Sequence, residues 1–121
     1  MMLFYLGIFG ILGVFTRFAL DTYLNSSEFP LGTLVANILG CLITGIIFTV
    51  IQNKTHLIAN YFLIGFCGAL TTFSSYSLQG FTFLNDRQMM KGLGYLFASP
   101  VLGVLFIFIG TIISKNFFFS N

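Results

Sequence analysis

The chain contains a run of 29 uncharged residues, 57–85, whose centre is too polar for an ordinary membrane helix. About 20 apolar residues are enough to cross the hydrocarbon core of a bilayer. From Gly65 to Ser77 this run reads GFCGALTTFSSYS, so that two glycines are followed by a cluster of hydroxyl groups. Backbone that loses its helical conformation at membrane depth is tolerated only where it is buried in protein or lines an aqueous cavity. The sequence therefore predicts a functional break at the centre of this span.

Composition places the whole chain in the membrane. Hydrophobic residues make up 57% of the 121 residues and charged residues 7%, which leaves too little polar surface to coat a soluble domain. Short polar stretches separate four apolar runs, each long enough to span a bilayer. We therefore expect an all-α membrane protein that forms a single transmembrane domain over residues 1–121, with both chain ends on the same side. The expected transmembrane helices cover about residues 2–24, 30–53, 57–85 and 91–115.

No pattern in the sequence indicates catalysis or a metal site built from side chains. Cys41 and Cys67 each lie inside an apolar run without partners for a disulfide or a tetrahedral metal, and we expect them to pack. His56 follows Lys54 and Thr55 in a predicted loop, where a solvated role is expected. Neither an enzyme nor a nucleic-acid-binding protein is expected, and any site must lie within the membrane.

The positive charges of the loops do not select an orientation in the membrane. Cytoplasmic loops normally carry an excess of Lys and Arg. Here Lys54 and Lys115 fall at one end of the predicted bundle, whereas Arg87 and Lys91 fall at the other. Chance can produce this balance in a short protein. The sharper hypothesis is that the chain inserts both ways and that two opposite copies pair about a two-fold axis in the membrane plane.

A small set of polar side chains lies within the apolar runs, where each costs free energy unless it is paired. Tyr95, Ser99 and Gly103 recur every four residues and therefore share one face of the fourth helix. Single hydroxyl groups in a bundle often do no more than bond to backbone carbonyls, but a set that faces inward indicates a polar route. The set comprises Arg17, Thr33, Asn37, the cluster at 71–77, Gln79, Tyr95 and Ser99.

Three sequence blocks occur in order along the first three predicted helices. The first helix has Gly13 and Arg17, and the second begins with PLGTLVANILG at 30–40. The third carries GFCGALTTFS at 65–74. Together these blocks resemble the Fluc/CrcB fluoride channels, and the resemblance covers essentially the whole chain, at matching depth and with the same number of spans.

This resemblance implies a passive channel of the bacterial inner membrane that lets accumulated cytoplasmic fluoride leak out. It further implies an antiparallel dual-topology homodimer with two pores in the lipid bilayer. In that family a structural Na⁺ lies at the dimer centre on backbone carbonyls, which here would be those of Gly68 and Thr71 from both subunits. Oxygen ligands at a helix break also suit a hard cation.

The resemblance also implies a fluoride pathway. Asn37 would supply amide donors to the anion, and the rings of Phe73 and Tyr76 would present their edges. An aromatic edge is partly positive, so it can bind a small anion without a full countercharge that would trap it. The implied pathway residues are Asn37, Phe73, Ser74, Tyr76, Ser77, Gln79, Tyr95 and Ser99, supported by Arg17, Thr33 and Thr72.

Three departures from the family pattern fall on this pathway. Tyr76 replaces a Phe, Gln79 replaces a common Glu, and Gly103 stands where a hydroxyl residue is usual. These departures keep open the alternative that the chain is one subunit of a heterodimeric fluoride channel. A small dual-topology multidrug exporter would need a carboxylate within the first helix and aromatic residues around it, often Trp. The chain has no Trp, and its only acid there, Asp21, lies beside the loop. A non-transporting membrane subunit is a further alternative.

Overall fold

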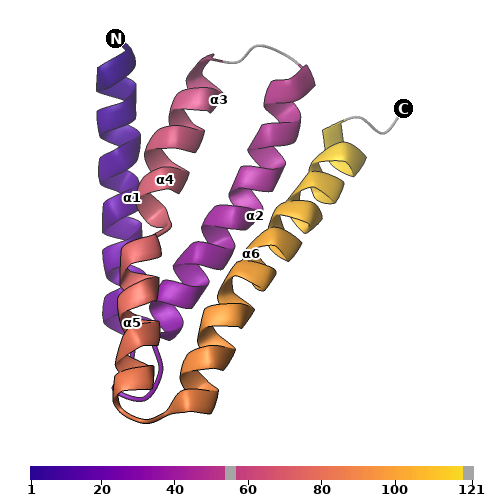
Figure 1. The fold of residues 1–121 in the computed structure, drawn as a ribbon. Helices are drawn as coiled ribbons and strands as arrows, with labels where there is room; N and C mark the ends of the chain where they lie inside the picture. The colour runs from indigo at the N-terminus through magenta and orange to yellow at the C-terminus, as the bar shows by residue number, and fades with distance from the viewer. Residues whose placement is uncertain (54–56, 119–121) are drawn as a thin grey trace.

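A computed structural model describes residues 1–53 and 57–118, and all the regular elements of these residues are helices (Figure 1). Four helical stretches are long and apolar enough to cross a membrane, as the sequence predicted. The N-terminus and the end of the last helix lie at the same end of the bundle (Figure 1). Lys54, Thr55 and His56, including the predicted solvated His56, lie outside the described residues. The elements are α1 (Met2–Leu24), α2 (Leu31–Asn53), α3 (Leu57–Phe62), the π-helical η1 (Leu63–Cys67), α4 (Gly68–Leu70), α5 (Phe73–Asn85) and α6 (Met89–Phe118).

The connection between α1 and α2 is held by a side-chain cap. Asn25 follows the last residue of α1, and its Oδ1 accepts hydrogen bonds from the backbone N–H groups of Gly32 (2.7 Å) and Thr33 (3.3 Å). The first N–H groups of a helix have no partner within the helix. Asn25 thereby satisfies the start of α2 and holds it against the end of α1.

The third span is broken near its middle and changes packing partner there. Its first half, α3 to α4, packs against α1, whereas α5 packs chiefly against α6. Between the halves, Thr71 (φ −78°, ψ 149°) and Thr72 (φ −144°, ψ 118°) are extended. The expected break is therefore present at these two residues, while Gly68–Leu70 remains helical. The turn from one partner to the other requires this loss of helix.

Glycine residues, which have no side chain, allow the backbones to come close around the break. A Cβ atom at Gly13 of α1 would overlap the carbonyl oxygen of Phe66 in η1. A Cβ atom at Gly40 of α2 would overlap the side-chain methyl of Thr71. Small residues at helix contacts in membranes permit such close approach. Both glycines therefore help to hold the broken segment between α1 and α2.

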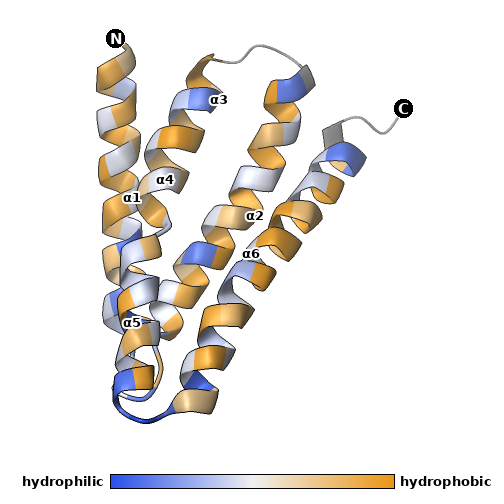
Figure 2. Cartoon of the chain, viewed as in Figure 1, coloured by the Kyte–Doolittle hydropathy of each residue, from blue (hydrophilic) through white to orange (hydrophobic). Residues whose placement is uncertain are grey.

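The outer faces of the bundle are apolar, as lipid contact requires. Hydrophobic residues run along all the helices, and hydrophilic residues gather at the turn between α5 and α6 (Figure 2). α2 and α6 pack against each other more extensively than any other pair of elements. The buried polar residues are threonines and serines, among them Thr33, Thr72 and Ser99. The chain is thus a multi-pass membrane protein whose interior polar groups need partners inside the bundle.

Candidate functional site

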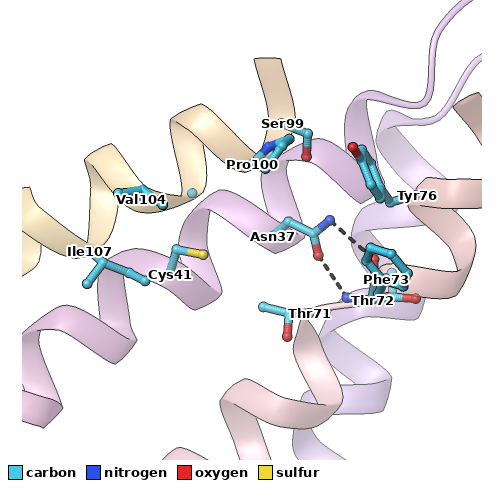
Figure 3. Close-up of a pocket in the computed structure, with 11 residues that line it drawn as sticks. Asn37, Cys41, Thr71, Thr72, Phe73, Tyr76, Ser99, Pro100, Val104 and Ile107 are labelled. Atoms are coloured by element: carbon cyan, nitrogen blue, oxygen red, sulfur yellow. Dashed lines mark hydrogen bonds between the residues drawn. The ribbon is translucent and has the colours of Figure 1, made fainter. Parts of the chain in front are cut away.

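Asn37 clamps the break in the third span. Its Oδ1 accepts a hydrogen bond from the backbone N–H of Thr72 (2.8 Å), and its Nδ2 donates to the carbonyl oxygen of Thr72 (3.3 Å). Figure 3 shows both bonds reaching from α2 to the extended segment. A side-chain amide matches a peptide group in donor and acceptor, so one residue pairs with both. Asn37 is therefore first a structural partner of the break, and one of its two N–H donors is committed there.

The clamp and the adjacent cap release two backbone carbonyls from helical bonding. In a continuous helix the N–H of Thr72 would donate to the Gly68 carbonyl, but here it donates to Asn37. The N–H of Ser75 would likewise donate to the Thr71 carbonyl, but it donates to the Thr72 Oγ1 (3.2 Å). Gly68 and Thr71 thus lose their usual helical donors within a membrane span. These are the two carbonyls that the family resemblance implies as ligands of a structural Na⁺.

A groove of about 400 Å³ opens beside the break, between α2, α5 and α6 (Figure 3). Its polar groups come from the Asn37 amide, from hydroxyl residues and from the Tyr76 phenol. None of the described residues that line it carries a charge, so it offers dipoles and ring edges rather than ions. The lining residues are Asn37, Cys41, Thr71, Thr72, Phe73, Tyr76, Ser99, Pro100, Gly103, Val104 and Ile107.

Two rings stand at one side of this groove. The centroids of Phe73 and Tyr76 are 5.9 Å apart and their planes are tilted by 47°. Phe73 is 81% exposed in the isolated chain, whereas the Tyr76 hydroxyl donates to the carbonyl oxygen of Leu96 in α6. An exposed ring next to a broken helix contributes little to the packing of one chain. Its place is consistent with a role toward a ligand or a second copy.

The opposite part of the groove lacks the hydroxyl group that a continuous polar track would need at position 103. Gly103 lines it, and a Cβ atom there would lie 3.2 Å from the Cys41 sulfur. Cys41, which was predicted to pack, is half-buried and lines the groove, whereas Cys67 is buried. A hydroxyl residue at 103 would need Cys41 to move. The departure at Gly103 therefore goes together with the thiol across the groove.

A second polar group of residues joins all four spans. The Tyr95 hydroxyl donates to Gln79 Oε1 (2.7 Å), and Gln79 Nε2 donates to Thr33 Oγ1 (2.8 Å). The Thr33 hydroxyl donates in turn to Asp21 Oδ1 (3.0 Å), which also accepts from Asn25 Nδ2 (3.2 Å). We call Tyr95, Gln79, Thr33 and Asp21 the four-span chain. It runs from α6 through α5 and α2 to α1 and ends on a carboxylate.

Most of the predicted pathway and supporting residues thus fall into two groups. Asn37, Phe73, Tyr76 and Ser99 line the groove, whereas Gln79, Tyr95 and Thr33 lie in the four-span chain. Their roles in conduction stay predictions. The remaining residues are Ser74, which is exposed with its Oγ 3.4 Å from Thr72 Oγ1, Ser77, which is half-buried on α5, and Arg17, which is half-buried on α1 one turn before Asp21.

Sequence reasoning missed the structural parts of Asp21 and Asn25. It treated Asp21 only as an acid beside the loop. The spacing of four residues between them, at the end of an apolar run, was the available sign, because such residues share a helix face. Their partner Thr33 lies 12 residues beyond Asp21, and no local pattern indicates that contact.

No group of three or more His, Cys, Asp or Glu side chains that could hold a metal ion occurs among residues 1–53 and 57–118. Any cation in this region would therefore depend on oxygen atoms of other kinds. The released carbonyls of Gly68 and Thr71 are of the kind that hard cations prefer.

The chain is similar to one family model and to named relatives over most of its length. Residues 4–111 match the family model described as "CrcB-like protein, Camphor Resistance (CrcB)". A protein of Hahella chejuensis named "Fluoride-specific ion channel FluC" is 30% identical over 93% of this chain and 94% of its own length. "Fluoride-specific ion channel FluC 1" of Streptococcus pneumoniae serotype 4 is 34% identical over 93% of this chain and 100% of its own length. "Fluoride-specific ion channel FluC 2" of Listeria innocua is 31% identical over 88% and 84%, respectively.

Proposed function

Because the chain belongs to the CrcB-like protein family, we propose that it is a passive, fluoride-selective channel that protects a bacterium by letting cytoplasmic fluoride leave the cell. Its membrane would be the bacterial inner membrane. The relatives named above share its length and are named fluoride-specific channels. The channel needs no catalytic residue, because fluoride flows down its own gradient.

The observation that carries this proposal is the uncharged groove beside the clamped break. Phe73, Tyr76 and Ser99 line it together with Asn37, at the point where the third span is not helical. Ring edges and hydroxyl groups attract a small anion weakly enough to release it again. A lysine or arginine in their place would hold the ion instead of passing it on. Asn37 still has one amide hydrogen that is not used by Thr72.

We further propose that the active unit is an antiparallel homodimer of two oppositely inserted copies. The exposure of Phe73 and the open side of the groove support this, because both invite cover from a second chain. In the sequence, Arg87 and Lys91 at one end of the bundle balance Lys54 and Lys115 at the other, which is in keeping with insertion in both directions. In such a dimer each groove would be completed by residues of the partner.

A structural Na⁺ at the two-fold axis is part of the same proposal. The carbonyl groups of Gly68 and Thr71 fit this role, because the Asn37 clamp and the Thr72 cap have withdrawn their helical donors. The bound cation would offset the partial negative charge of these oxygens and hold the two breaks together. Asn37 and Thr72 act indirectly, by keeping those carbonyls free.

The alternative is that the chain serves as one of two different subunits of a heterodimeric channel, an arrangement that the departures at Tyr76, Gln79 and Gly103 favour. The small multidrug exporter considered from the sequence is set aside, because its family is a different one.

Fluoride efflux from liposomes that hold this chain alone tests the proposal. We expect rapid efflux of fluoride and none of chloride, measured with ion-selective electrodes after dilution into ion-free buffer. Efflux that appears only when a second CrcB-like chain is added would replace the homodimer by the two-chain alternative. The absence of fluoride efflux in both cases would contradict the proposed function.

A further inference from the structure

Pro100 lies inside α6 and removes one hydrogen-bond donor from the fourth span. In an α-helix the N–H of each residue donates to the carbonyl four residues earlier, and proline has no N–H. The carbonyl of Leu96 therefore has no helical donor. A carbonyl without a partner is costly at membrane depth unless water reaches it, so a protein donor at this position stabilises the span.

The Tyr76 hydroxyl is that partner. It donates a hydrogen bond to the Leu96 carbonyl oxygen and so links α5 to α6. Figure 3 shows the Tyr76 ring beside the turn of α6 that carries Ser99 and Pro100. A phenylalanine has no hydroxyl group and cannot make this bond. The tyrosine at 76 and the proline at 100 thus complement each other across two spans.

The bond also holds a ring that lines the groove. The Tyr76 ring is fixed to α5 at its Cβ and to α6 at its hydroxyl group. Its centroid lies 5.9 Å from that of Phe73 and 5.4 Å from that of Tyr95. Resting on the proposed function, we propose that Pro100 is a positioning residue of the fluoride route. By withholding its N–H, it leaves the Leu96 carbonyl to Tyr76, and this bond sets the Tyr76 ring edge beside the groove.

The hydrogen bond can be tested without any measurement of flux. Leucine labelled at the carbonyl carbon with ¹³C, combined with ¹⁵N-phenylalanine, selects three peptide bonds for solid-state NMR: Leu3–Phe4, Leu96–Phe97 and Leu105–Phe106. Tyr76→Phe should move one of the three carbonyl resonances. In a Pro100→Ala background the alanine N–H replaces the donor, so the same substitution should move none.

The consequence for conduction is tested by a double-mutant cycle in liposomes. Tyr76→Phe alone should lower fluoride flux about fivefold or more, because the ring loses its second attachment, whereas the same change in Pro100→Ala should alter flux less than about twofold. Coupling of this size is expected for residues that are in contact or act through one hydrogen-bond network, and the carbonyl measurement identifies the hydrogen bond as its origin. Tyr95→Phe is the matched control. Its hydroxyl donates to Gln79, so its effect should be the same in both backgrounds.

The outcomes separate this proposal from the proposed function. The positioning role is supported if the effect of Tyr76→Phe on flux and its effect on the carbonyl resonance both depend on whether residue 100 is proline. Additive flux effects, or a Leu96 carbonyl that does not respond to Tyr76→Phe, overturn it even in a fully conducting channel. If the parent chain conducts no fluoride, the proposed function is wrong, and with it any role of Pro100 in a fluoride route. In that case the NMR shift alone still decides whether Pro100 positions Tyr76.

Discussion

At the scale of single residues, Phe73 and Asn37 of the groove differ in how much they contribute to the fold. Phe73 is 81% exposed in the isolated chain, so its removal cannot greatly weaken the fold of that chain. Asn37, in contrast, pairs with both polar groups of the Thr72 backbone. A loss of flux at Phe73 therefore reports conduction, whereas a loss at Asn37 also reports the state of the break.

Phe73→Ile should lower fluoride flux about fivefold, since a ring-edge contact of about 1 kcal/mol is lost while bulk and apolarity remain. The measurement is efflux from liposomes, with dimer content followed by cross-linking. Phe81→Ile is the matched control, because Phe81 is also an exposed ring of α5 (62%) but does not line the groove. Equal flux in the two variants would remove Phe73 from the working pore.

Asn37→Asp should both block flux and destabilise the protein. Its Oδ1 can still accept from the Thr72 N–H, but an oxygen replaces the Nδ2 that donates to the Thr72 carbonyl. An unpaired carbonyl facing a second acceptor costs about 1–3 kcal/mol. Thermal unfolding in detergent measures this cost, and Asn116→Asp on the exposed end of α6 is the control. A variant as stable as the parent would show that the clamp is dispensable.

At the scale of elements, the third span is organised by its cap. Thr72 is the N-cap residue of α5, and its side chain accepts a hydrogen bond from the Ser75 N–H. The same bond frees the Thr71 carbonyl. The cap therefore determines both where α5 starts and which backbone oxygens become available at the break.

Thr72→Val keeps the shape of the side chain but removes the cap, and it should lower the free energy of unfolding by about 1 kcal/mol. Thr72→Ser should retain most of the stability, because its hydroxyl can still accept from Ser75. Thermal unfolding at several Na⁺ concentrations would also show whether the variant loses a Na⁺-dependent part of its stability. If valine and serine behave alike, the cap does not define the break.

The four-span chain makes a prediction about the departure at Gln79. Gln79 donates to Thr33 and accepts from Tyr95, and an ionised glutamate could only accept. Gln79→Glu would place the Thr33 hydroxyl, which has one hydrogen to donate, between two carboxylates: the new one at position 79 and that of Asp21. This substitution should lower the unfolding temperature. Adding Asp21→Asn should restore it, because the Thr33 hydroxyl could then donate to Glu. If the double variant is no more stable than Gln79→Glu alone, the charge conflict is not the cause.

At the scale of the whole molecule, the dual-topology dimer is open to a labelling test. Asp86→Cys, in a background where Cys41 and Cys67 are alanine, places an exposed thiol on the turn after α5 without changing the number of Lys and Arg residues. We expect a membrane-impermeant reagent to label it from both sides of the membrane in cells. Labelling from one side alone would contradict dual insertion of this chain.

The four spans and the location of the break could be predicted from sequence, because the length of an apolar run and a hydroxyl cluster within it are local features. The partners in the site could not. Asn37 meets Thr72 across 35 residues, and the Tyr76 acceptor exists only because Pro100 lacks an N–H. The four-span chain depends on how α1, α2, α5 and α6 pack together. Such contacts follow from the packing of helices and not from any single segment.

The four-span chain has a consequence for how the protein is made. Its links are translated in the order Asp21, Thr33, Gln79 and Tyr95, while its hydrogen bonds point from the last of these to the first. Until α6 is in place, the side-chain Oε1 of Gln79 has no Tyr95 hydroxyl from which to accept a hydrogen bond. A nascent chain that lacks α6 therefore carries an amide oxygen without its partner, which costs free energy wherever that oxygen is kept from water.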